Sequence, residues 1–358
     1  MAIKPTGYAQ SETYKEILSQ GDVWQSVLQE LKQSAYEERM LRSNNRKTSW
    51  VFVGCGTSFY LADAAATSWT LLTGEPARAV PGSEILLYPA LTRSEASILR
   101  AIVISRSGRT SEAVRAAHVL RKEMQIPTIG ITCAEKSELE AECDSTLVLK
   151  VADEKSTVMT RSFTSMLISL QWMAARRAGN TEFCDSLEVM ATQFAMRIRS
   201  LAEQMEAFVD RNSFEDYVFL GQGPSHGIAR EAALKVMEMS CSYSQSFHTL
   251  EFRHGPKAIV TARTALTFFL SQSGLQSEIE VLEEMKELGG VTIAVCNRAN
   301  ENIRRASDLI LELNLPGDEL TQLAPHIVPI QLMGFFTGAS KGLNPDQPKN
   351  LTRVVVLD

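Results

Sequence analysis

Residues 51–66 read VFVGCGTSFYLADAAA, and residues 218–233 read VFLGQGPSHGIAREAA. In both stretches a short run of β-branched and aromatic residues stops at a glycine-bearing turn and passes into small, helix-forming residues. This order predicts a buried strand, a tight turn and a helix, which together begin a βαβ unit. The two stretches lie 167 residues apart.

Three further pairs of segments recur in the same order. SRSGRTSE at residue 105 answers SQSGLQSE at residue 271, an offset of 166. IPTIGITC at residue 126 answers VTIAVC at residue 291, and CDSTLVL at residue 143 answers SDLILEL at residue 307. A chance alignment would not keep its offset across a whole domain, so the sequence predicts two copies of one α/β unit.

Near-continuous apolar strands that alternate with helices predict, in each copy, a parallel sheet covered on both faces. In the first copy we expect strands at 49–53, 98–104, 127–132 and 145–151, before a long helix at about 163–178. The second copy is expected to carry a polar loop after its first helix, and the chain to end in a strand-like VVVL. The predicted plan is a helical lead-in (1–48), a first domain (49–178), a helical linker (179–213), a second domain (214–340) and a tail (341–358).

The composition is that of an ordinary globular protein, with 44% hydrophobic and 22% charged residues among 358. A net charge of −6 argues against a nucleic-acid surface, although local backbone donors can still bind an anion. The N-terminus has no apolar signal segment and no apolar run reaches the length of a membrane span, so we expect a cytoplasmic protein. Six scattered cysteines show no metal-ligand spacing, and neither a metal nor a cofactor is expected.

Two turns of the first copy, 54–58 and 105–111, are expected at the carboxyl ends of parallel strands, where open sheets bind ligands. The second turn carries Ser105, Ser107, Thr110 and Ser111, next to unpaired amides at the positive end of a helix dipole. This combination suits a phosphate group. The alternative is that the hydroxyls only cap the helix. The second copy's turn lacks the threonine and both arginines, so we expect its anion site to be weaker or lost.

The second copy carries charges that the first lacks. Glu231, Lys235 and Glu238 fall on one face of an otherwise apolar helix, and the segment continues to Glu251, Arg253 and His254. A buried helix that keeps charges must give them partners or a task. One interpretation is a site for proton transfer. The other is a structural Glu231–Lys235 pair with Glu238 at the surface.

These features resemble the sugar isomerase (SIS) family, and within it the double-SIS isomerase domain of the glutamine–fructose-6-phosphate aminotransferases. The resemblance covers nearly the whole chain, from TYKEI near the N-terminus to DQPKNL near the C-terminus. It implies two tandem SIS domains, each a three-layer αβα sandwich of the flavodoxin-like type. The other motifs that carry it are GCGTS (54–58), SRSGRT (105–110), IAREAALKVMEMS (228–240) and EFRHGP (251–256).

The resemblance also implies site residues. Glu238 matches the glutamate that moves a proton between C1 and C2 of the sugar, and Glu231 and Lys235 match other residues of the active-site helix. His254 matches the histidine that opens the sugar ring, which a neighbouring subunit supplies, so a homodimer is implied. Arg106 stands where the family usually has glutamine, which allows an extra phosphate contact. The residues that match the sugar-phosphate site are Thr57, Ser58, Ser105, Arg106, Ser107 and Thr110.

Two departures limit how much of the family mechanism carries over. The aminotransferases begin with a glutaminase domain, and this chain begins MAIKPTGY with no room for one, so we expect a glutamine-independent reaction. The family's Schiff-base lysine is replaced in the tail by Arg353. A guanidinium stays protonated at physiological pH and cannot act as an amine nucleophile.

The chain also resembles stand-alone amino-sugar phosphate deaminases and isomerases of this family. The resemblance therefore implies an isomerase or deaminase of an amino- or keto-hexose 6-phosphate, with Glu238 as the acid/base. A carboxylate in an apolar helix can acquire the near-neutral pKa that such a step needs. Other sugar-phosphate isomerases and fructosamine-phosphate deglycases remain as alternatives. A non-catalytic sugar-phosphate-binding module is an alternative of another class.

Overall fold

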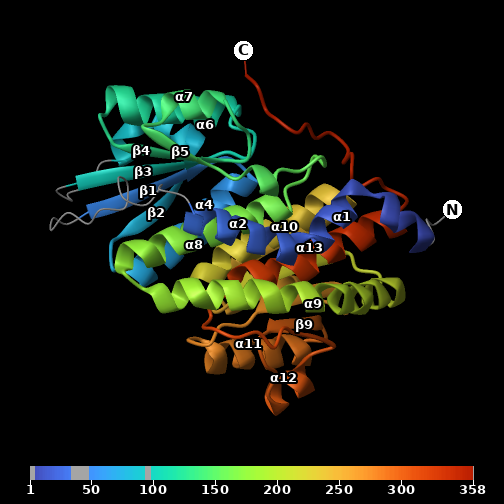
Figure 1. Cartoon of the computed structure of the whole chain (residues 1–358). Helices are drawn as coiled ribbons and strands as arrows, with labels where there is room; N and C mark the ends of the chain where they lie inside the picture. The colour runs from blue at the N-terminus through green and yellow to red at the C-terminus, as the bar shows by residue number, and fades with distance from the viewer. Residues whose placement is uncertain (1–4, 34–47, 93–97, 358) are drawn as a thin grey trace. The chain divides into compact units, whose positions relative to one another are not determined.

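The computed structural model describes residues 5–33, 48–92 and 98–357, and its contacts group into two compact units. The first-sheet unit comprises residues 22–154, 161–188 and 352–358, and the second-sheet unit comprises 1–21, 155–160 and 189–351. Figure 1 shows the chain coloured along its sequence. The lead-in is thus divided between the units and the end of the tail groups with the first sheet. Residues 1–4 and 34–47 of the predicted lead-in lie outside the described residues.

The first-sheet unit holds a parallel five-stranded sheet in the order β2-β1-β3-β4-β5. Residues Trp50 and Phe52 of β1 face α4, where they contact the ring of Trp69 at centroid distances of 4.5 and 5.6 Å. The strand's alternate residues, Val51 and Val53, pack on the opposite face against α5 and α6. The strands are β1 (Thr48–Gly54), β2 (Ala77–Pro81), β3 (Ile98–Ile104), β4 (Thr128–Thr132) and β5 (Ser145–Val148). The helices are α2 (Gln20–Gln33), α4 (Thr57–Thr73), α5 (Gly82–Leu87), α6 (Ser111–His118), α7 (Glu138–Glu142) and α8 (Arg161–Ala178), with short turns of helix at η2 (Pro89–Thr92), η3 (Val119–Glu123) and η4 (Lys150–Ala152).

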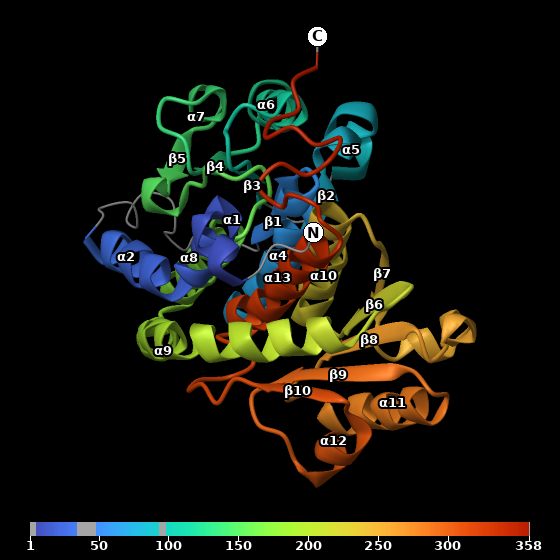
Figure 2. The same cartoon turned by 90° about the vertical axis from the view of Figure 1, so that its right-hand side faces the viewer.

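The second-sheet unit repeats this topology, with a parallel sheet in the order β10-β9-β8-β6-β7. Figure 2 shows α11 and α12 on one side of β9 and β10. They pack there against Val218, Leu220 and Phe268, while α10 contacts α13. The strands are β6 (Asp216–Gly221), β7 (Tyr243–His248), β8 (Thr264–Phe269), β9 (Val291–Cys296) and β10 (Leu309–Glu312). The helices are α1 (Glu12–Leu18), α9 (Thr181–Arg211), α10 (Pro224–Ser240), α11 (Leu275–Glu287), α12 (Glu301–Ala306) and α13 (Leu323–Ser340), with turns of helix at η1 (Pro5–Gln10), η5 (Glu251–Arg253) and η6 (Pro256–Ile259).

Equivalent backbone groups make the same hydrogen bonds in the two copies. The carboxylate of Asp144 accepts from the amide of Thr128 at 2.9 Å, and that of Asp308 accepts from the amide of Thr292 at 2.9 Å. Each bond begins the fourth strand of its copy. The predicted pair of α/β units in the flavodoxin-like strand order is therefore confirmed.

Glycine is required at the same point of the first turn in each copy. Gly56 has φ 55° and ψ −126°, and Gly223 has φ 54° and ψ −129°. A side chain at either position would be strained in this conformation. The shared backbone explains why the pattern GxG recurs at the offset of 167 residues.

Two local predictions were wrong. The segment expected as a polar loop after α10 contains β7, which pairs with β6 at the edge of the second sheet. The strand-like VVVL at the C-terminus forms no strand, because Val355 and Leu357 bond to groups at the start of α6 instead of joining a sheet. The linker is one continuous helix, α9.

Candidate active site

The two first-copy turns follow β1 and β3, which are neighbours at the point where the strand order reverses. Ser58 and Thr57, in the first turn of α4, are buried, and so is Ser105, which is only 2% exposed. The hydroxyl of Ser105 donates to that of Thr110 at 3.4 Å. The structure thus places the predicted phosphate ligands at the topological switch point, where open α/β sheets bind ligands.

The hydroxyls in this turn do little helix capping. Thr110 occupies the N-cap position of α6, but its side chain makes no capping hydrogen bond. The hydroxyl of Ser107 accepts from the amide of Arg109 at 3.2 Å, within the turn. The alternative that these residues serve only as caps therefore finds no support at Thr110.

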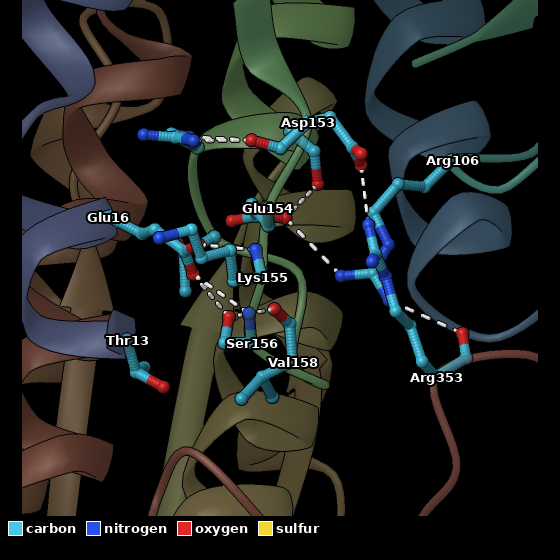
Figure 3. A network of polar contacts seen from close by, with 12 residues as sticks. Thr13, Glu16, Arg106, Asp153, Glu154, Lys155, Ser156, Val158 and Arg353 are labelled. Carbon is cyan, nitrogen blue, oxygen red and sulfur yellow. Dashed lines mark hydrogen bonds and ion pairs between the residues drawn. The ribbon is translucent and has the colours of Figure 1, made fainter. Parts of the chain in front are cut away.

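Arg106 lies in the same turn but its guanidinium is 5% exposed. One of its terminal nitrogens lies 3.4 Å from a carboxylate oxygen of Glu154, and the other donates to the backbone carbonyl of Arg353 at 3.3 Å. The guanidinium of Arg353 pairs with Asp153 at 2.7 Å. Figure 3 shows both arginine head groups facing the 153–154 dipeptide. The charge of Arg106 is thus partnered by the protein itself.

The equivalent turn of the second copy is bonded to a carboxylate. Glu319 accepts from the amides of Gln272 and Ser273 at 2.8 and 2.9 Å, and from the Ser273 hydroxyl at 2.6 Å. The neighbouring Glu278 is buried and accepts from the amide of Ser271. Burial raises the pKa of Glu278 to about 7 against the pull of the Ser271 hydrogen bonds. A negative side chain thus lies where the first copy is expected to hold a phosphate.

On α10 the structure brings the predicted acid/base residues together. Lys235 is 1% exposed, and its ammonium lies 3.3 Å from the carboxylate of Glu231 and also donates to Glu238. Burial disfavours its charged form, but the two carboxylates outweigh this and raise the pKa of Lys235. The side chain of Glu238 keeps 17% exposure. Both the structural-pair and the proton-transfer interpretations include this contact, and Glu238 is the most exposed of the three side chains.

His254 ends the short helix η5 and is exposed. Its role across a dimer interface stays a prediction. The phosphate-turn residues belong to the first-sheet unit, while Glu231, Lys235, Glu238 and His254 belong to the second-sheet unit.

Three features were not found from the sequence. Glu319 and its turn are 46 residues apart, so no local pattern links them. His226 and His248 stack with ring centroids 3.7 Å apart, at the carboxyl ends of β6 and β7. A cavity of about 330 Å³ in the second-sheet unit is lined by Asp210, Tyr217, Thr337 and Lys341 among others. None of the predicted site residues lines this cavity.

Cys55 lies in the first-copy turn 54–58. Burial, together with the nearby Glu112, raises the pKa of Cys55 to about 11, which disfavours a thiolate. Within residues 5–33, 48–92 and 98–357, no three His, Cys, Asp or Glu side chains cluster as metal ligands do. In the same part of the chain, no helix is both long enough and apolar enough to span a bilayer.

Comparison with known proteins agrees with this architecture. The isomerising glutamine–fructose-6-phosphate aminotransferase of Methanothermobacter thermautotrophicus is 25% identical over 308 residues, which cover 86% of this chain and 51% of that protein. The chain spans about half the length of the curated relatives it matches.

Solved structures of similar proteins cover the full length of the chain. A glucosamine-6-phosphate deaminase from Thermotoga maritima is 28% identical with a TM-score of 0.77, over 97% of this chain and 100% of that chain. The fold is shared with the tagatose-6-phosphate ketose/aldose isomerase of Escherichia coli, at 24% identity and a TM-score of 0.84, over 100% and 98% of the two chains. The SIS domain model matches residues 44–176 and 215–335, which contain the two sheets. The chain therefore belongs to the SIS-domain family and carries two copies of the domain.

Proposed function

We propose that this chain is a glutamine-independent isomerase and deaminase of an amino- or keto-hexose 6-phosphate. The observation that carries the proposal is the charged cluster on α10, in which buried Lys235 contacts both Glu231 and Glu238. Burying a lysine between two carboxylates costs desolvation energy. A role in proton transfer would explain why the protein has these buried charges despite that cost. The similarity of the chain to the glucosamine-6-phosphate deaminase of Thermotoga maritima supports the same class of substrate.

In the proposed reaction the first-copy turns anchor the phosphate and Glu238 moves one proton. Glu238 takes the C2 proton of the open-chain aldose and returns it to C1, while the O2 proton passes to O1, so the carbonyl moves from C1 to C2. For a 2-amino sugar the same shift leaves an imine at C2. One water molecule then hydrolyses this imine to the ketose and ammonia. His254 assists ring opening before these steps.

The tail favours a reaction that does not pass through an enzyme-bound imine. Arg353 stands at the position of the family's Schiff-base lysine, and its guanidinium is paired with Asp153. Because a guanidinium keeps its proton, it forms no imine with the substrate. The deamination route above needs no imine between enzyme and substrate, because the amino group at C2 of the sugar itself becomes the imine that water hydrolyses.

The test is to incubate the purified protein with glucosamine 6-phosphate and to measure ammonia and fructose 6-phosphate. We expect the two products in equal amounts. Glu238→Gln should lower kcat about 10³-fold, the usual size of a lost general acid/base. Glu287→Gln, which changes an exposed carboxylate at the end of α11, is the matched control.

Each other outcome has a distinct meaning. A Glu238→Gln variant as active as the parent would remove the acid/base assignment. Ketose formation from an aldose phosphate without ammonia release would indicate a plain isomerase, and release of a substituted amine a deglycase. Binding without turnover on any hexose or hexosamine phosphate would indicate a regulatory module.

We also propose that His254 acts on the site of a partner subunit in a homodimer. Two inactive variants, Glu238→Gln and His254→Ala, should then regain activity when they are denatured together and refolded as a mixture. The reason is that a mixed dimer contains one site with both residues intact. No recovery in a mixture that mass measurement shows to contain mixed dimers would contradict the proposal.

A further inference from the structure

The dipeptide Asp153-Glu154 contacts two arginines that are distant in sequence. Glu154 has a fully buried side chain and lies 3.4 Å from Arg106, and the hydroxyl of Ser162 also donates to it. Asp153 lies 2.7 Å from the guanidinium of Arg353. Arg106 in turn donates to the Arg353 carbonyl at 3.3 Å. Figure 3 shows this chain of contacts, all of whose members belong to the first-sheet unit.

The tail beyond Arg353 is bonded to the start of α6. The amide of Ser111 donates to the carbonyl of Val355 at 3.2 Å, and the amide of Leu357 donates back to the Ser111 hydroxyl at 2.9 Å. Arg115 donates to the Leu357 carbonyl at 3.2 Å. Ser111 directly follows the turn 105–110. The tail is thus fixed next to the turn to which the phosphate is assigned.

We propose that Arg106 is a positioning residue that holds the C-terminal tail against this turn, rather than a ligand of the phosphate. Together Arg106, Asp153, Glu154 and Arg353 form what we call the tail clamp. The clamp rests on the proposed function in one respect only, which is the assignment of the turn 105–110 as the phosphate site. The contacts of the clamp exist whatever the substrate is.

Burial and charge support the assignment of Arg106. Its guanidinium is 5% exposed and faces a carboxylate that is itself fully buried. To reach a phosphate, Arg106 would have to give up its contact with the buried carboxylate of Glu154, and separating a buried ion pair is strongly unfavourable. The arginine therefore serves the tail in its present position.

The two ion pairs of the clamp differ in exposure to solvent. Arg106 and Glu154 are buried, whereas Arg353 and Asp153 are each 41% exposed. An exposed pair contributes little and is screened by salt. The buried Arg106–Glu154 pair thus holds Arg106 in place within the turn. The exposed Arg353–Asp153 pair is the one that salt or a mutation can break.

Hydrogen exchange of two amides tests the clamp without any substrate. The Ser111 and Leu357 amides are bonded only if the tail is docked, so they report directly on it. Asp153→Asn, a change at an exposed pair, should speed their exchange several-fold, and the double variant Arg106→Gln/Glu154→Gln at least about tenfold. Lys150→Gln, which breaks an exposed ion pair with Glu135 elsewhere in the unit, is the matched control. Unchanged exchange in both clamp variants, with cooperative unfolding retained, would overturn the proposal.

A binding measurement separates the clamp from direct phosphate binding. Glu154→Gln removes the charge that competes for Arg106. If Arg106 were a phosphate ligand, this change would tighten the binding of inorganic phosphate, measured by titration calorimetry. The clamp predicts the opposite, with faster exchange at Leu357 and phosphate binding weakened or unchanged. Tighter phosphate binding with unchanged Leu357 exchange would sink the proposal, and it would do so whether or not the protein turns over glucosamine 6-phosphate.

Discussion

The turns after β3 and β8 have nearly the same sequence, SRSGRTSE and SQSGLQSE, but they are bonded differently. In the second copy Glu319 accepts from the amides of Gln272 and Ser273. In the part of the chain that the structure describes, no carboxylate accepts from the corresponding amide of Ser107. The comparison shows that a duplicated anion turn can be satisfied from within the protein. Under the proposed function, only the first-copy turn binds the phosphate of the ligand.

The largest expected difference between the copies is sensitivity to acid. His326, on α13 of the second-sheet unit, is 2% exposed, and burial lowers its pKa to about 4 although Glu319 pulls the other way. Because the folded pKa lies below the ordinary value of about 6.5, its stabilising contribution is complete above pH 6.5 and is lost as the pH falls towards 4. The loss should reach about 3 kcal/mol of the free energy of unfolding at pH 4.

His326→Phe should remove this part of the pH dependence. The phenyl ring keeps the packing against Phe269, whose ring centroid lies 6.3 Å from that of His326. Urea unfolding of parent and variant at pH 7, 6, 5 and 4 gives the difference. If both proteins lost stability in parallel over this range, the assignment to His326 would be wrong.

A smaller effect is expected at Glu319. Glu319→Gln weakens charge-assisted hydrogen bonds to the second-copy turn, so the free energy of unfolding should fall by about 2 kcal/mol. The KM for the sugar phosphate should not change, because this turn is not the proposed phosphate site. The exposed variant Glu287→Gln controls for the loss of one negative charge. A tenfold rise in KM with normal stability would instead indicate that the second turn takes part in binding.

The smallest effect distinguishes the two serines that begin the turns. Ser105→Ala should raise the KM about tenfold, equivalent to about 1.4 kcal/mol for one hydrogen bond to a charged group. Ser271→Ala removes a hydroxyl that accepts from the amide of Gly274 and donates to Glu278, so it should change stability but leave KM within about twofold. Equal effects of the two variants on KM would erase the proposed division between the copies.

The repeat predicted the two parallel α/β units and their turns, and the family resemblance implied the flavodoxin-like type. β2 (Ala77–Pro81), at the edge of the first sheet, was not among the predicted strands. Strand, GxG turn and helix depend on neighbouring residues, and Gly56 and Gly223 have matching backbone angles. β7 was missed because an edge strand of polar residues, YSQSFH, lacks the apolar pattern of the central strands.

The partners of the charged residues were less predictable. The Glu231–Lys235–Glu238 group follows from helical spacing alone. The pairing of Arg106 with Glu154 and the bonding of Glu319 to residues 272 and 273 join segments that only the fold brings together. Whether a charge meets a ligand or a counter-charge is a tertiary property, so the sequence alone could not show that Arg106 contacts Glu154.

The paired aspartates, Asp144 and Asp308, carry a warning for mutational screens of this chain. Each accepts a hydrogen bond from an amide near the start of a strand in its own copy, and neither belongs to the proposed site. A screen that measures only product would rank substitutions of both aspartates beside substitutions of Glu238, because misfolded protein and folded but inactive protein both form no product. Measuring the amount of folded protein together with turnover would separate loss of folding from loss of chemistry. Substitutions of Asp144 and Asp308 would then be classed as loss of folding.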